Sequence, residues 1–152
     1  MIGFNSQPPT AIITILTGFA FEVQNKSKYE GFVFNIILGK GMSSVTIITD
    51  AEFSAEVLQA EQPVLVYFWA AWCGPCRLMA PMMETVAADY GDRLKVIKME
   101  VDPNPASVKT CKVDGVPAFR LFQAGEVVAS VEGAIPKQQV EAFLTNHMPI
   151  LS

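Results

Sequence analysis

Hydrophobic and polar positions follow two different periods along this chain from about residue 45 onward. Short apolar runs rich in β-branched and aromatic residues predict buried strands, and apolar residues three or four positions apart predict helices with one buried face. This order of elements, closing with a hairpin, predicts an α/β fold: a central mixed sheet with helices on both faces. The predicted strands are 45–49, 64–70, 94–101, 118–123 and 127–132; the predicted helices follow a capping box at 49–52, span 75–90 and 105–111, and begin at 136.

Residues 1–41 differ in composition from the rest. No residue before Glu22 is charged, and residues 11–21 are apolar. The segment has neither the basic start and small-residue cleavage site of a signal peptide nor the arginines of a transit peptide. It is either a translated upstream stretch, with Met42 as the natural initiator, or an extension that packs as an extra strand or helix. We therefore divide the chain into an N-terminal extension, 1–41, and a main domain, 42–152.

Composition narrows the class of protein further. A chain of 152 residues that is 51% hydrophobic favours one well-packed domain. Its net charge of −4 gives no excess of positive charge that would attract nucleic acid. No apolar run in the sequence approaches the length of a membrane-spanning helix. Three cysteines are too few for a disulfide-stapled secreted scaffold, so we expect a reducing compartment, the cytoplasm.

The segment Trp72-Cys73-Gly74-Pro75-Cys76 carries the clearest chemistry. Two cysteines three positions apart on the first turn of a helix bring their sulfurs within bonding reach. Cys73 falls at a strand-to-helix turn, where unpaired N–H groups and the helix dipole stabilise a thiolate. Pro75 suits the first helical turn, which needs no N–H there. The motif predicts reversible thiol–disulfide chemistry.

Two other interpretations of the cysteine pair are a zinc half-site and an inert pair. Zinc needs two further ligands, and only Cys111 and His147 are available, as single residues distant along the chain. The strand-to-helix context favours redox chemistry. We accordingly expect neither a metal nor a cofactor.

These residues resemble the thioredoxin family, whose active-site pentapeptide is identical to residues 72–76. The resemblance covers the chain from about Val45 to Met148. It implies the thioredoxin fold and a monomeric protein-disulfide reductase, which takes electrons from a thioredoxin reductase and passes them to oxidised protein substrates. The other matching positions are 68–70, Pro81, Lys98, Asp102, 115–117, 122–125 and 133–134.

The resemblance also assigns roles to the two cysteines. Cys73 would be the exposed nucleophile, and the more buried Cys76 would resolve the mixed disulfide. Oxidising and isomerising relatives carry a histidine between the cysteines, which stabilises the reduced form. Gly74 and Pro75 offer no such charge, so the resemblance favours a reductase.

A substrate-docking surface is implied around the motif. In the family, the proline that matches Pro117 is cis and packs against the disulfide, leaving a backbone edge at Val116 that can pair with an extended substrate. Small, weakly polar residues there suit many partners. The expected docking residues are Trp72, Val116, Pro117, Gly133 and Ala134.

Two positions leave alternatives open. The family usually has a buried aspartate, which relays a proton during resolution, where this chain has Tyr67. A tyrosine is a poor base at neutral pH, so either the rate is lowered or Tyr67 fills the core with its hydroxyl bonded to Lys98 or water.

Cys111 would be either a regulatory thiol near the rim of the docking surface or a small buried hydrophobe. The rival functions are a slower, specialised oxidoreductase and a redox-poor module that binds proteins without turnover.

Overall fold

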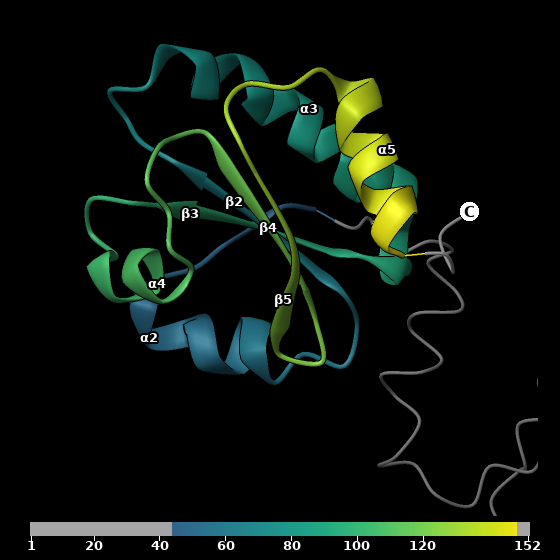
Figure 1. Cartoon of the computed structure of the whole chain (residues 1–152), viewed down its shortest axis with the longest axis horizontal. Helices are drawn as coiled ribbons and strands as arrows, with labels where there is room; N and C mark the ends of the chain where they lie inside the picture. The colour runs from purple at the N-terminus through teal and green to yellow at the C-terminus, as the bar shows by residue number, and fades with distance from the viewer. Residues whose placement is uncertain (1–43, 149–152) are drawn as a thin grey trace, which may run out of the picture. The chain divides into compact units, whose positions relative to one another are not determined.

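A five-stranded mixed sheet forms the centre of the computed structural model, which describes residues 44–148 (Figure 1). The strand order is β1-β3-β2-β4-β5. β3 lies parallel to β1 and β2, whereas β4 runs antiparallel to β2 and β5, so the predicted mixed sheet is confirmed. The strands are β1 (Thr46–Ile47), β2 (Val64–Trp69), β3 (Lys95–Glu100), β4 (Ala118–Gln123) and β5 (Glu126–Glu132).

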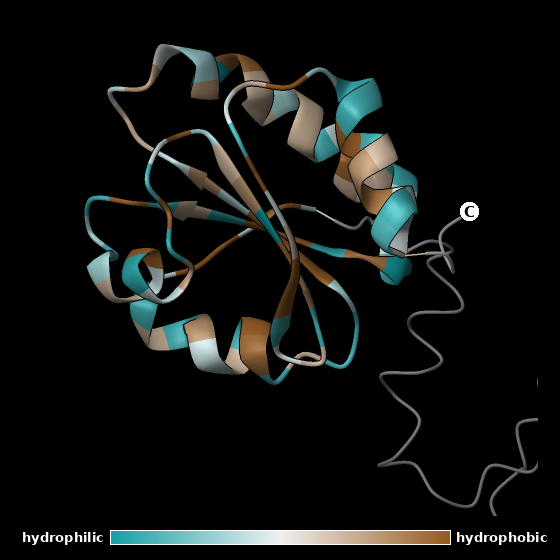
Figure 2. Cartoon of the chain, viewed as in Figure 1, coloured by the Kyte–Doolittle hydropathy of each residue, from teal (hydrophilic) through white to brown (hydrophobic). Residues whose placement is uncertain are grey.

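Helices cover both faces of this sheet, as predicted. α3 and α5 lie on one face, and α2 and α4 lie on the other (Figure 1). The helices mix hydrophobic and hydrophilic positions because each has one side on the sheet and one toward solvent (Figure 2). They are α2 (Asp50–Phe53), which continues as the π-helical turn η1 (Ser54–Leu58), α3 (Gly74–Tyr90), which ends in the 3₁₀ turn η2 (Gly91–Arg93), α4 (Pro105–Thr110) and α5 (Lys137–His147).

Strand β2 contributes side chains to two hydrophobic clusters, one on each face of the sheet. Its side chains point alternately to the two faces, and its first five positions are all buried. Leu65 and Tyr67 enter the cluster beneath α3 and α5, whereas Val66 and Phe68 enter the cluster beneath α2 and α4. This is why an uninterrupted apolar run, rather than an alternating one, marks a central strand.

Local signals at element ends are mostly confirmed. The Glu52 carboxylate accepts the Thr49 N–H at 2.9 Å, as the capping box requires. The first strand is shorter than predicted, because only Thr46 and Ile47 pair with β3. Residues 1–41 lie outside the described part of the chain, so their status remains a prediction.

The hairpin between β4 and β5 is tighter than predicted. Glu126 pairs with Gln123 as the first residue of β5, leaving a two-residue turn at Ala124 and Gly125. Both turn residues have positive φ, +50° and +80°, which suits the twist of a two-residue hairpin. A Cβ on Gly125 would lie 2.5 Å from the Leu58 carbonyl oxygen, so this position requires glycine.

Candidate active site

Cys73 and Cys76 form a disulfide at the start of α3, with their Cα atoms 5.4 Å apart. Cys73 is the N-cap, and its Sγ accepts the Cys76 backbone N–H at 3.2 Å. That N–H belongs to the first turn, where helical N–H groups have no partner within the helix. The same contact and the helix dipole favour a thiolate at Cys73 once the disulfide is reduced. Gly74 and Pro75 form the exposed outer side of the turn.

The Cys73 side chain is less exposed than the resemblance suggested. It is 5% exposed and Cys76 is 1% exposed, so the expected order holds but neither residue projects into solvent. Cys73 is shielded because it is bonded to a buried partner and packs with it in the core beneath α3. In the disulfide form, only a small part of Cys73 is therefore open to a substrate sulfur.

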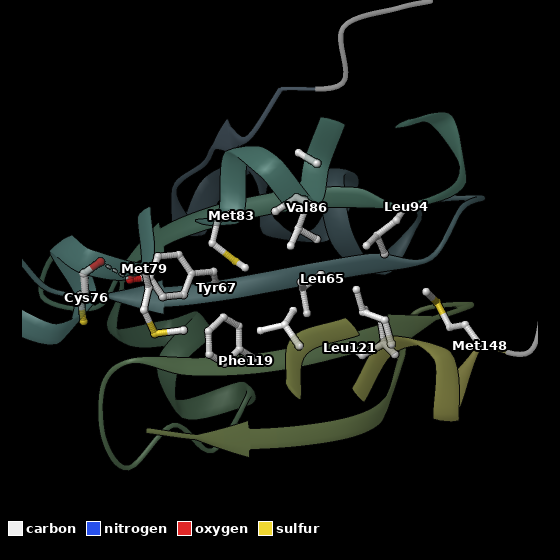
Figure 3. Packing of buried hydrophobic residues seen from close by; sticks show 14 of the residues in the cluster. Leu65, Tyr67, Cys76, Met79, Met83, Val86, Leu94, Phe119, Leu121 and Met148 are labelled. Atoms are coloured by element: carbon white, nitrogen blue, oxygen red, sulfur yellow. Dashed lines mark hydrogen bonds between the residues drawn. The ribbon is translucent and has the colours of Figure 1, made fainter. Parts of the chain in front are cut away.

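Tyr67 lies directly beneath the first turn of α3. Its Oη donates to the Cys76 carbonyl oxygen at 2.8 Å, and its ring stacks on Phe119 with centroids 5.2 Å apart (Figure 3). The side chain is fully buried, and burial raises the pKa of the phenol to about 12. The phenol is therefore neutral at physiological pH, and it donates its hydrogen bond to a backbone carbonyl oxygen.

The hydrogen bond to Lys98, which was one of the alternatives for the Tyr67 hydroxyl, does not form. The two residues are neighbours in the register of β2 and β3, but the Lys98 Nζ lies 4.1 Å from the centroid of the Trp69 ring. An ammonium group is attracted to the face of an indole ring. The Cys76 carbonyl supplies the acceptor that the phenol needs, so Lys98 is not required by it.

The expected docking residues are held by several contacts around the disulfide. Trp72 is 69% exposed, and its Nε1 donates to the Asp102 carboxylate at 3.0 Å. The Val116–Pro117 peptide is cis, with Pro117 buried and Val116 half-buried. The Gly133 N–H donates to the Pro117 carbonyl at 2.8 Å and so links the two loops.

Ala134 lines a shallow apolar groove of about 320 Å³ beside the motif. Leu78, one helical turn beyond Gly74, also lines this groove and is 83% exposed. Leu78 is not among the docking residues expected from the sequence. The available signal was its place directly before Met79, which faces the core, so that an apolar Leu78 side chain would face solvent. The groove is lined by Pro75, Leu78, Met79, Met82, Ala134, Ile135 and Pro136.

Cys111 is a buried hydrophobe rather than an accessible thiol. It is 4% exposed and packs with the cluster beneath α2 and α4, on the sheet face opposite Cys73 and Cys76. Burial raises the pKa of its thiol to about 11, although Arg120 nearby acts in the other direction. Because thiolate is the reactive form, this environment does not support a regulatory role.

Neither remaining candidate ligand lies near the cysteine pair. Cys111 lies on the opposite face, and the His147 Nδ1 is 2.7 Å from the Phe143 carbonyl oxygen at the end of α5. Within residues 44–148, no three histidine, cysteine, aspartate or glutamate side chains gather into a cluster that could hold a metal ion. Within the same residues, no helix is long and apolar enough to cross a membrane.

Comparison with known proteins agrees with this geometry. The family model for thioredoxin matches residues 44–146. The chain is 56% identical over 108 residues to a thioredoxin-like protein of Synechocystis sp., covering 71% of this chain and 99% of that relative. It is 41% identical to thioredoxin 1 of Synechococcus elongatus over 107 residues, 70% of this chain and 100% of the relative. It is also 41% identical to thioredoxin of Acidithiobacillus ferridurans over 105 residues, 69% and 97% of the two chains.

These matches span the sheet, its helices and the disulfide-forming pair described above. The paired cysteines and the family together indicate thiol–disulfide redox chemistry, with disulfides as substrates and a reductase as the partner in general terms. This chain belongs to the thioredoxin family.

Proposed function

We propose that this chain reduces disulfide bonds in other proteins, with Cys73 as the nucleophile and Cys76 as the resolving thiol. The observation that carries the proposal is the contact between the Cys73 Sγ and the Cys76 N–H at the start of α3. This contact stabilises charge on Cys73 and offers nothing to the sulfur of Cys76. Cys73 is also the more accessible of the two residues.

The reaction begins from the reduced pair. The Cys73 thiolate attacks one sulfur of the substrate disulfide; the bond between the two substrate sulfurs breaks, and one leaves as a thiolate that takes a proton. Cys76 then loses its proton and attacks the Cys73 sulfur, which releases the second substrate thiol. Two electrons have moved to the substrate, and the Cys73–Cys76 disulfide has formed. One of the two protons on the product thiols comes from Cys76, and the other comes from solvent, which received it when Cys73 ionised.

The segment between the cysteines favours this direction. Gly74 and Pro75 carry no charge that would further stabilise the reduced pair, so the oxidised form is comparatively favoured and the protein gives electrons away. The disulfide must then be reduced again by a thioredoxin reductase. We expect this cycle to operate in the cytoplasm, with the protein acting as a monomer.

The docking surface suits an extended protein substrate. The Val116 backbone beside the cis peptide can pair with a substrate strand. Trp72, Gly133 and Ala134 are exposed and carry no charged group, so they place few demands on the sequence of the partner.

Trapping tests the roles of the two cysteines. A Cys76→Ser protein should accumulate mixed disulfides with substrate proteins, because Cys73 can still attack but nothing internal releases the product. Cys111→Ser is the matched control and should trap no more than the unaltered protein. If Cys73→Ser traps partners and Cys76→Ser does not, the two roles are reversed.

A second candidate function is a redox-poor module that binds proteins through the same surface. Tyr67 favours it, because a neutral phenol bonded to a backbone carbonyl cannot act as a base for the second cysteine. Turnover separates the two functions: a reductase reduces insulin disulfides repeatedly with dithiothreitol as electron donor. A single stoichiometric reaction followed by no further turnover would support the binding module instead.

A further inference from the structure

Arg120 is a charged residue in the middle of a central strand. It lies on β4, three positions after Pro117, and is 4% exposed. Its guanidinium donates to three backbone carbonyls: Nε to Cys111 at 2.9 Å, Nη2 to Lys112 at 2.7 Å and Nη1 to Phe119 at 3.0 Å. A buried guanidinium with this many acceptors fixes the position of the chain that carries them. Two of these carbonyls, those of Cys111 and Lys112, belong to the segment that follows α4, and the third, that of Phe119, belongs to β4 itself.

Glu132 is the acidic partner of this guanidinium. It is the last residue of β5, and its Oε1 lies 2.6 Å from the Arg120 Nη2. The same oxygen accepts the backbone N–H of Asp114 at 3.3 Å. The hydrogen bond from Arg120 holds the pKa of the Glu132 carboxyl below its usual range, so the group is charged at neutral pH.

The position of these contacts in the fold links them to the docking surface. Asp114 begins the loop that leads to the cis peptide at Val116–Pro117, and Glu132 directly precedes Gly133. The two loops also meet where the Gly133 N–H donates to the Pro117 carbonyl. One carboxylate thus contacts the start of one docking loop and immediately precedes the other.

We propose that Arg120 and Glu132 are a positioning pair that fixes the spacing of the two docking loops, and so sets the affinity for protein substrates without taking part in the sulfur chemistry. The inference rests on the proposed function, since it concerns the surface on which a protein substrate would dock. Neither side chain bonds to Cys73 or Cys76.

The open surface beside the pair explains why a polar contact is needed there. A groove of about 580 Å³ lies between the end of α4 and the exposed edge strand β5. Loops next to open solvent cannot be held by apolar packing on that side. The groove is lined by Cys111, Lys112, Asp114, Ser130 and Val131, together with the pair itself and other neighbours.

Substitution of Glu132 tests the proposal, because replacing Arg120 would leave buried carbonyls unpaired and disturb folding. Glu132→Ala removes both contacts, whereas the amide oxygen of Glu132→Gln can still accept them. Glu126→Ala is the matched control, an exposed glutamate at the other end of β5. Two substrates are compared, insulin and hydroxyethyl disulfide, the second being too small to span the docking loops.

We expect Glu132→Ala to raise the KM for insulin by about tenfold with kcat within about twofold, the pattern of lost binding rather than lost chemistry. Glu132→Gln should lie between Glu132→Ala and the unaltered protein, and Glu126→Ala should match the unaltered protein. The rate with hydroxyethyl disulfide should not change in any variant. An unchanged KM for insulin, or equal losses with both substrates, would overturn the proposal.

Hydrogen exchange provides a measurement that does not depend on activity. In Glu132→Ala the amides of Asp114 and Gly133 should exchange at least about tenfold faster, while those of β2 stay as slow as before. Unchanged exchange at both amides would overturn the positioning role. If the unaltered protein does not turn over insulin at all, the proposed function fails, and exchange alone still decides whether the pair holds the loops.

Discussion

Tyr67 is the position where a single substitution tests the most reasoning about the reaction. In the resolving step Cys76 must lose a proton inside the protein, where burial raises a thiol's pKa. The phenol of Tyr67 is neutral and donates to the Cys76 carbonyl rather than to its sulfur. Tyr67→Asp would place a carboxylate beneath the same helical turn. Tyr67→Phe would remove only the hydroxyl and keep the ring stacked on Phe119.

The two substitutions differ in size and therefore in their effects. Tyr67→Phe loses one buried hydrogen bond, worth about 1 kcal/mol of stability, and leaves no cavity of side-chain size. Tyr67→Asp loses a fully buried ring, which costs about 3–5 kcal/mol, and also buries a carboxylate. In return, a positioned general base is worth about 10²-fold in rate. We expect Tyr67→Asp to be less stable and faster at neutral pH, and Tyr67→Phe to reduce disulfides within about twofold of the original rate.

Insulin reduction measured across pH, together with melting curves, decides between these expectations. An unchanged or slower rate in a well-folded Tyr67→Asp protein would refute the argument, and a Tyr67→Phe protein that is many times slower would show that the phenol relays the proton. Alkaline melts provide a further check. Because the folded pKa of about 12 exceeds the ordinary value of 10.0, Tyr67 contributes stability that is lost as pH rises above 10.0. Tyr67→Phe should lack this part of the alkaline loss.

The remaining predictions concern stability. Burial opposes ionisation of Asp50, but hydrogen bonds from the first turn of α4 outweigh it and lower its pKa; Asp50→Asn should therefore cost about 1 kcal/mol at neutral pH, with the difference disappearing in melts well below pH 3.8. Gly125→Ala should cost about 2 kcal/mol or more by chemical denaturation, because its φ is positive and its Cβ would lie 2.5 Å from the Leu58 carbonyl oxygen. A protein beginning at Met42 should melt at nearly the same temperature as the full chain and reduce disulfides at a similar rate; a large loss of either would show that residues 1–41 contribute to the core.

The secondary structure and the reactive pair could be predicted from sequence because both depend on neighbours close along the chain. The apolar run of β2 and the three-residue spacing of Cys73 and Cys76 are local patterns, and local geometry converts them directly into a buried strand and a disulfide across one turn. Glu52 reaching back to Thr49 is equally local, which is why the capping box was also correct.

Contacts between distant parts of the chain were decided only by the tertiary structure. Asp50 bonds to the start of α4 more than fifty positions away, and Glu132 meets Arg120 and Asp114 across a hairpin and a loop. No period in the sequence encodes such partners, because they depend on strand register and on how helices pack over the sheet. Because of the same packing, the Tyr67 hydroxyl donates to the Cys76 carbonyl and not to Lys98, and Cys111 is buried on the sheet face away from the disulfide. The sequence by itself thus determined the type of chemistry that each side chain can perform. The atoms that each side chain contacts were decided only by the elements packed around it in the tertiary structure.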